Sequence, residues 1–192
     1  MSFALNGPAP WYATGGPGLW YATRATGLVS LLLLTGTMLL GIVTAGRFAS
    51  ENWPRFLTVG LHRNMTLLVL IFLALHVGTT VVDTYTSIPA TAAVIPFVSS
   101  YKSLWLGLGA VAADLLLAVM ATSLLRNKLG FRAWRGLHWL AYACWPVALI
   151  HALGTGTDRR TLWVFAAALA CVAAVAAAAT WRLAAAARAG SR

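Results

Sequence analysis

Five long apolar runs constrain this chain more than any other feature of its sequence. Each has roughly 20 residues or more, which is enough to cross a hydrocarbon core about 30 Å thick as a helix. The sequence therefore predicts an all-α membrane protein, a bundle of five transmembrane helices. The expected spans are Gly18–Ala45, Phe56–Val82, Ser103–Leu125, Trp134–Leu153 and Thr161–Leu183.

Composition excludes a soluble domain. Only 9% of the residues are charged, whereas about 25% is typical of soluble domains. The first run is not predicted to be a cleavable signal peptide, because an uncharged, aromatic-rich stretch replaces the usual basic start. We expect residues 1–17 to form an extracytoplasmic segment, with WYAT at 11–14 and 20–23 at the membrane interface. Residues 18–183 form the transmembrane domain, and 184–192 form a short basic cytoplasmic tail.

The net charge of +10 follows from membrane orientation and does not indicate nucleic-acid binding. Ten of the fourteen Lys and Arg residues fall on one side of the predicted spans. The positive-inside rule places that side in the cytoplasm, so the N-terminus is outside and the C-terminus is cytoplasmic. The expected location is the cell membrane. The ten are Arg47, Arg55, Arg63, Arg126, Lys128, Arg132, Arg135, Arg182, Arg188 and Arg192.

All four histidines lie at matching intervals on two of the spans. His62 and His76 are 14 residues apart, about 21 Å along a helix, and point to nearly the same side. His138 and His151 are 13 apart on a span that runs in the same direction. Facing imidazoles at two depths are the arrangement that binds two haems axially. The alternative is four histidines that only make hydrogen bonds within the bundle. Zinc or copper would need three or four ligands around one ion.

The 13-residue interval raises a geometric problem. Thirteen residues fall about 140° short of four turns, so His138 and His151 would not share a face of an ideal helix. Pro146 lies between them, and proline distorts helices. We therefore predict a tightened turn near Cys144–Pro146.

These histidines, together with the basic stretch RNKLGFRAWRGLH at 126–138, resemble the ferric reductase-like transmembrane domain shared by ferric reductases and NADPH oxidases. The resemblance covers roughly Arg24–Asp158. It implies two haem b groups, with His62 and His138 on the iron of the inner one and His76 and His151 on that of the outer one. It also implies ferric reductase-like electron transport from the cytoplasm to an acceptor outside, whose identity stays open.

The chain departs from that family pattern in two respects. One helix of the six-helix pattern is missing, and no strand–GxGxxG–helix unit is present, so we expect no FAD or NADPH site in this chain. The donor is then a cytoplasmic flavoprotein reductase or a membrane quinol. Two alternatives stay open: a quinol-linked haem b subunit of a multi-protein oxidoreductase, and a non-redox accessory subunit of a membrane complex.

Haem propionates need cationic partners, and several arginines lie near the histidines in sequence. Arg63, Arg132 and Arg135 are candidates for the inner haem, and Arg24 is the best candidate for the outer one, where Lys102, Arg159 and Arg160 are also available. Contact with lipid headgroups is the alternative for each.

Two acids also stand out. Asp83 either organises the outer site or lies in water at a helix end. For Asp114, inside a span, a structural hydrogen bond is favoured over a proton relay or a pair with an arginine. Between the second and third spans, residues 83–102 are expected to cap the outer face.

Overall fold

A computed structural model describes residues 16–46, 48–83, 88–156 and 161–190. Within these residues, five helical segments are long and apolar enough to cross a membrane, as the sequence predicted. They are α1 (Gly16–Ala45), α2 (Arg55–Val82), α3 (Ser103–Leu124), the pair α5 (Phe131–His138) and α6 (Leu140–Thr155), and α7 (Leu162–Gly190). Helix α7 continues through most of the segment that was expected to be a tail.

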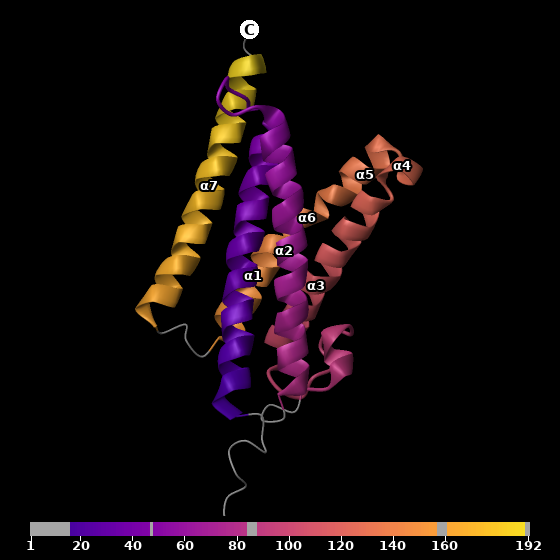
Figure 1. Ribbon diagram of the computed structural model, residues 1–192, viewed down its shortest axis with the longest axis vertical. Coiled ribbons are helices and arrows are strands. Elements are labelled where there is room, and N and C mark those ends of the chain that lie inside the picture. Colours follow the sequence, from indigo (N-terminus) through magenta and orange to yellow (C-terminus); the bar gives the residue numbers. More distant parts are fainter. Residues whose placement is uncertain (1–15, 47, 84–87, 157–160, 191–192) are drawn as a thin grey trace, which may run out of the picture.

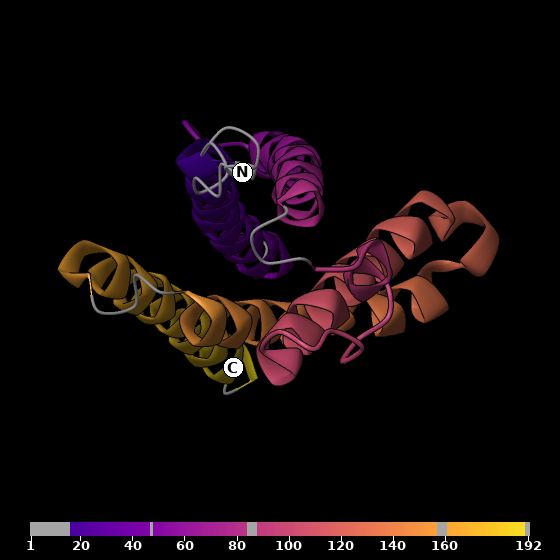
Figure 2. The same ribbon diagram turned by 90° about the horizontal axis from the view of Figure 1, so that it is seen from below.

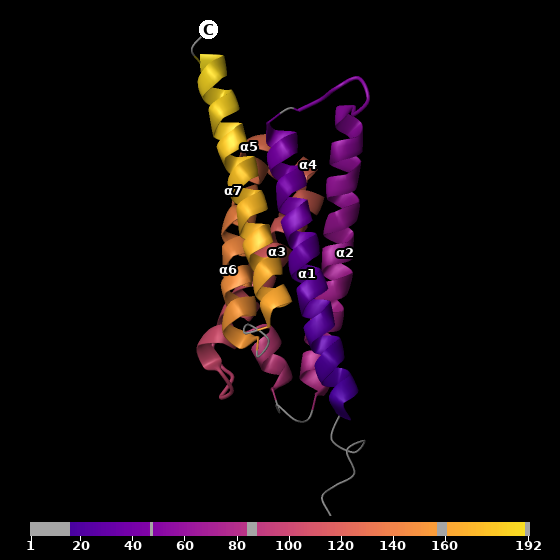
Figure 3. The same cartoon turned by 90° about the vertical axis from the view of Figure 1, so that its left-hand side faces the viewer.

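The helices run the length of the bundle in alternating directions. Helix α1 begins at the lower end of Figure 1 and α7 finishes at the upper end, so the first and last spans point the same way. Packing is most extensive between α1 and α2 and between α3 and α6, and α1 also contacts α6 and α7. Seen from below, α1 and α2 lie on one side and α3, α6 and α7 on the other (Figure 2). Figure 3 shows α1 and α2 side by side along their whole length.

The connections differ at the two ends. At the upper end, the short helix α4 (Arg126–Leu129) leads into α5 through Gly130, whose φ of 76° favours glycine. At the lower end, the 3₁₀ turn η2 (Ala90–Ala93) packs on α2 and α3. Lys102 Nζ donates to the Thr155 carbonyl at 3.0 Å. The described part of the 83–102 segment therefore covers the lower end of the bundle, as a cap would.

The tightened turn lies at Trp139, so the predicted position near Cys144–Pro146 is wrong. Trp139 N–H donates to the Gly136 carbonyl at 3.2 Å, and Tyr142 N–H donates to the Trp139 carbonyl at 3.0 Å. Both bonds span three residues, as in a 3₁₀ turn. Helix α6 continues past Pro146. Proline removes only one backbone donor, and membrane helices tolerate that loss where neighbouring groups compensate.

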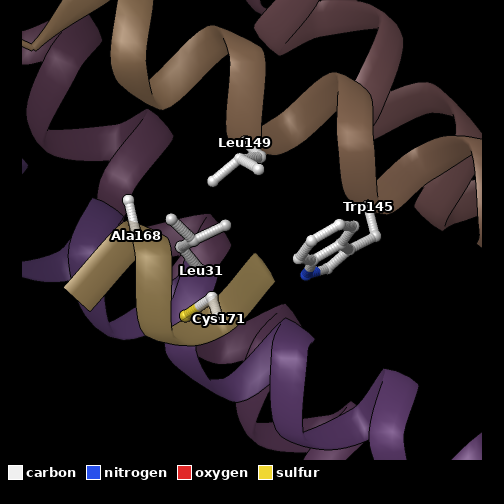
Figure 4. Close-up of a cluster of buried hydrophobic side chains, with 5 residues drawn as sticks. All are labelled: Leu31, Trp145, Leu149, Ala168 and Cys171. Atoms are coloured by element: carbon white, nitrogen blue, oxygen red, sulfur yellow. The ribbon is translucent and has the colours of Figure 1, made fainter. Parts of the chain in front are cut away.

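Two buried clusters hold the bundle together. The first joins α1, α6 and α7, and its members are Leu31, Trp145, Leu149, Ala168 and Cys171 (Figure 4). The second joins α2, α3 and α6 through Val69, Leu116 and Cys144. Trp145 Nε1 donates to Thr35 Oγ1 at 2.9 Å, which ties α6 to α1. Cys144 and Cys171 are free thiols in these clusters, where they act as small apolar filler.

Candidate functional site: two facing histidine pairs

The four histidines form two facing pairs at two levels of the bundle. The ring centroids of His62 and His138 are 6.4 Å apart, and those of His76 and His151 are 6.3 Å apart. Within each pair, one ring comes from α2 and the other from the α5–α6 span. The levels are about 21 Å apart along α2, since 14 residues separate its two histidines.

The spacing within each pair suits two imidazoles on opposite sides of one metal ion. An imidazole nitrogen lies about 2 Å from the metal it binds, so two opposed rings have centroids about 6 Å apart. The observed 6.4 and 6.3 Å agree with that value. In the described part of the chain, no three His, Cys, Asp or Glu side chains gather where they could hold an ion. Each pair therefore offers two facing imidazole ligands.

Three of the rings are oriented by backbone carbonyls. His62 Nδ1 lies 3.0 Å from the Thr37 carbonyl, His76 Nδ1 lies 2.8 Å from that of Thr23, and His151 Nδ1 lies 2.7 Å from that of Trp105. A carbonyl only accepts, so each Nδ1 carries the proton and donates it. Nε2 then keeps its lone pair, which is the state that a metal ligand needs.

His138 is held differently from the other three. Its Nδ1 is buried and has no hydrogen-bond partner among the described residues. Its ring lies against Trp134, with centroids 5.1 Å apart and the planes inclined at 32°.

Glycines on α1 and α3 make room for three of the rings. A Cβ added to Gly27 would lie 2.9 Å from His76, and one added to Gly109 would lie 2.5 Å from His151. At Gly41 the corresponding distance to His62 is 3.4 Å. Because real Cβ contacts are longer than 3.0 Å, at least the first two positions need glycine for close approach.

A cavity of about 530 Å³ opens beside the lower pair. His76 and His151 line it together with Arg24 and Asp83, and it extends between the helices to the buried Val69. Its walls are mostly apolar side chains, and its size falls within the range of about 300–1,000 Å³ that is usual for ligand sites.

The predicted cationic partners are distributed unequally. Arg24 is half-buried, lines the cavity and lies 4.2 Å from the centre of the Trp20 ring. Arg63 is exposed in a shallow hollow of α2 that contains neither upper histidine, and Arg132 and Arg135 are exposed on α5. Among the predicted cations that the structure describes, only Arg24 lines the cavity beside His76 and His151. Outside the described residues lie the first WYAT copy, Arg47, Asp158, Arg159, Arg160 and Arg192.

The two acids lie in different environments. Asp83 is only 6% exposed at the end of α2, so a carboxylate in open water is excluded, and its place in the cavity wall fits the alternative of organising this site. Asp114 is half-buried in the middle of α3.

Sequence reasoning missed the groups that orient the rings. Thr23 and Gly27 serve His76, and Thr37 and Gly41 serve His62. The signal was present as a repeated Thr-x-x-x-Gly in α1, whose 14-residue interval equals the interval of the α2 histidines.

The role of Arg182 was also missed, because the sequence indicated only a charge that helps to orient the chain in the membrane. Arg182 of α7 is half-buried and donates to the Tyr142 hydroxyl of α6 at 2.9 Å. No sequence pattern marks this bond.

Comparison with known proteins gave one family. The model of the family described as "Ferric reductase like transmembrane component" matches residues 26–149, more than half of the chain. The match contains His62, His76 and His138 and ends just before His151. Comparisons with curated proteins and with solved structures each gave no match.

Proposed function

Since the chain belongs to the ferric reductase-like transmembrane family and is a multi-pass integral membrane protein, we propose that it transfers electrons across the membrane through two b-type haems. His62 and His138 would hold one haem, and His76 and His151 the other. A bound haem supplies one-electron chemistry at its iron, and the protein supplies ligation, orientation and burial.

The main support for this proposal is that the two imidazole rings of each histidine pair face each other. Two rings from different helices meet at 6.4 Å on one level and again at 6.3 Å on the next. Histidines that only packed within the bundle would not need to face each other in pairs at two levels. The Nδ1 bonds of His62, His76 and His151 to carbonyls add support, because a second-shell acceptor at Nδ1 is usual for a metal-binding imidazole.

The distribution of charge supports a direction of transfer from the cytoplasm to the outside. The positive-inside rule puts the His62–His138 pair on the cytoplasmic side and the His76–His151 pair on the outer side. Electrons would enter from a cytoplasmic flavoprotein reductase or a membrane quinol and leave to an acceptor outside. Between the levels, Val69, Leu116 and Cys144 form a buried apolar cluster. Such a cluster excludes water and keeps the two sites separate.

Arg24 has a role that matches a haem at the His76–His151 pair. Arg24 lines the cavity with His76 and His151, and a guanidinium there would neutralise a haem propionate. The exposed Arg63, Arg132 and Arg135 suit the cytoplasmic surface, where they would meet lipid phosphates or an anionic donor surface.

Haem content tests the proposal directly. The wild-type chain, His76→Ala and the control Asn64→Ala would be purified in detergent, with haem quantified by extraction and by reduced-minus-oxidised spectra. Asn64 is an exposed residue of the same helix. We expect two haems per polypeptide in the wild type and in the control, and one in His76→Ala. A wild-type protein without haem would overturn the proposal.

A further inference from the structure

Three of the four histidines are held by one repeated device. A backbone carbonyl on the neighbouring helix accepts the Nδ1 proton, and a glycine four residues later leaves space for the ring. We call this pair of residues a histidine station. The stations are Thr23–Gly27 for His76, Thr37–Gly41 for His62 and Trp105–Gly109 for His151.

The register of α3 locates where a fourth station would lie. On α1 the two stations are 14 residues apart, and α3 runs in the same direction as α1 (Figure 1). Fourteen residues after Trp105 and Gly109 come Val119 and Ser123. Since 14 residues are close to four helical turns, Val119 and Ser123 lie on nearly the same face of α3, at the level of His138.

Serine stands at this fourth position, where the other three stations have glycine. The Val119 carbonyl accepts from Ser123 Oγ at 2.7 Å and from Thr122 Oγ1 at 3.0 Å. A hydroxyl donor alone does not block a station, because the Thr23 carbonyl accepts from Thr26 Oγ1 at 3.1 Å and still serves His76. The difference at this fourth position is the Ser123 side chain, which stands where a glycine leaves space for the ring at the other stations. Ser123 Oγ in turn accepts from Trp134 Nε1 at 3.2 Å, and the Trp134 ring lies against His138. Among the described residues, His138 Nδ1 is the one histidine Nδ1 that is buried without a hydrogen-bond partner.

We propose that Ser123 is a positioning residue whose side chain fills the space that glycine leaves at the other stations. It thereby keeps the His138 ring away from the Val119 carbonyl and makes His138 a weaker electron donor than the other three ligands. This role rests on the proposed function. A carbonyl bond at Nδ1 raises the basicity of a ligating imidazole, and a more basic ligand stabilises the ferric state. The His76–His151 site has two such ligands and the His62–His138 site has one. Ser123 thereby raises the midpoint potential of the His62–His138 haem above the value that a glycine station would give.

The test compares Ser123→Gly with Ser123→Ala. Both variants remove the hydroxyl and the acceptor of Trp134, but only glycine gives the ring the space that it has at the other stations. Potentials would be measured by spectroelectrochemical titration of the full-length, haem-loaded protein, and His62→Ala would identify which haem belongs to this site. We expect Ser123→Gly to lower the midpoint potential of that haem alone, and Ser123→Ala to leave it unchanged.

A reciprocal variant guards against misfolding of Ser123→Gly. Gly41→Ser adds a side chain at the station with the most space, where a Cβ alone would lie 3.4 Å from His62 and fits, so that Gly41→Ala is its control. Gly41→Ser should raise the potential of the same haem relative to Gly41→Ala. Unshifted potentials in both serine–glycine exchanges, or equal shifts in each variant and its alanine control, would overturn the role of Ser123 while leaving the two haems in place. A haem-free wild type would overturn both proposals.

Discussion

Gly109→Ala measures how closely α3 holds the His151 ring. The new Cβ would lie 2.5 Å from Cε1 and 2.6 Å from Nδ1 of that ring. Non-bonded carbons prefer about 3.5–4.0 Å, so the ring or the helix must move by about 1 Å. The bond from Nδ1 to the Trp105 carbonyl is 2.7 Å long, and a shift of that size takes it beyond hydrogen-bond range.

Loss of this bond sets the expected magnitude. Removing a second-shell partner typically lowers metal affinity about 10–100-fold, and overpacking a tight contact costs about 1–3 kcal/mol. The effect should be smaller at the other stations, because the corresponding Cβ distances are longer, 2.9 Å at Gly27 and 3.4 Å at Gly41. Haem loss should therefore decrease from Gly109→Ala to Gly27→Ala to Gly41→Ala.

Haem per polypeptide, with difference spectra, would be measured on the purified variants. Gly78→Ala on α2 and Gly136→Ala on α5 are matched controls, since a Cβ at either position meets nothing within 4 Å. Glycine to alanine in a helix interior is by itself stabilising by about 0.5–1 kcal/mol, so helix propensity predicts the opposite sign. Full haem content with an unchanged spectrum in Gly109→Ala, or equal loss in the controls, would refute the reasoning.

Two further predictions concern the buried clusters. Trp145→Phe removes the indole bond to α1 and should lower stability in detergent by about 0.6–1.7 kcal/mol, measured by thermal denaturation, with both haems retained; haem loss would show that Trp145 supports the histidines directly. Cys144 and Cys171 are 2% and 5% exposed, so neither should react with a maleimide until the protein is denatured. Labelling of the folded protein, detected by mass spectrometry, would contradict this packing.

The membrane helices were predictable from sequence because lipid permits so few structures. A run of apolar residues in lipid must satisfy its own backbone hydrogen bonds, and a helix does so. The predicted starts and ends therefore fall close to those observed, as at Ala45, Val82 and Ser103. The pairing of His62 with His138 and of His76 with His151 also followed from residue counts, since rise per residue is nearly constant in helices.

The groups that hold the histidines were not predictable in the same way. Every residue has a backbone carbonyl, so the acceptors at Thr23, Thr37 and Trp105 leave no mark of their own. The repeated Thr-x-x-x-Gly of α1 is visible in the sequence, but a glycine in a membrane helix has many explanations, and Trp105–Gly109 does not share the threonine. The position of the tightened turn was missed for a related reason. Pro146 is the obvious signal for a distortion, whereas a 3₁₀ turn at Trp139 requires no special residue.

That turn explains how a 13-residue interval matches a 14-residue one. Thirteen residues of α-helix rise about 19.5 Å, against about 21 Å for the 14 on α2. In a 3₁₀ turn each residue rises about 2.0 Å instead of 1.5 Å and rotates about 120° instead of 100°. Thirteen helical residues also rotate about 100° less than fourteen do. Three residues in a 3₁₀ turn add about 1.5 Å of rise, which is the full deficit, and about 60° of that missing rotation. The turn at Trp139 thus stands in for one residue, which is why His138 and His151 both face α2 at nearly equal distances.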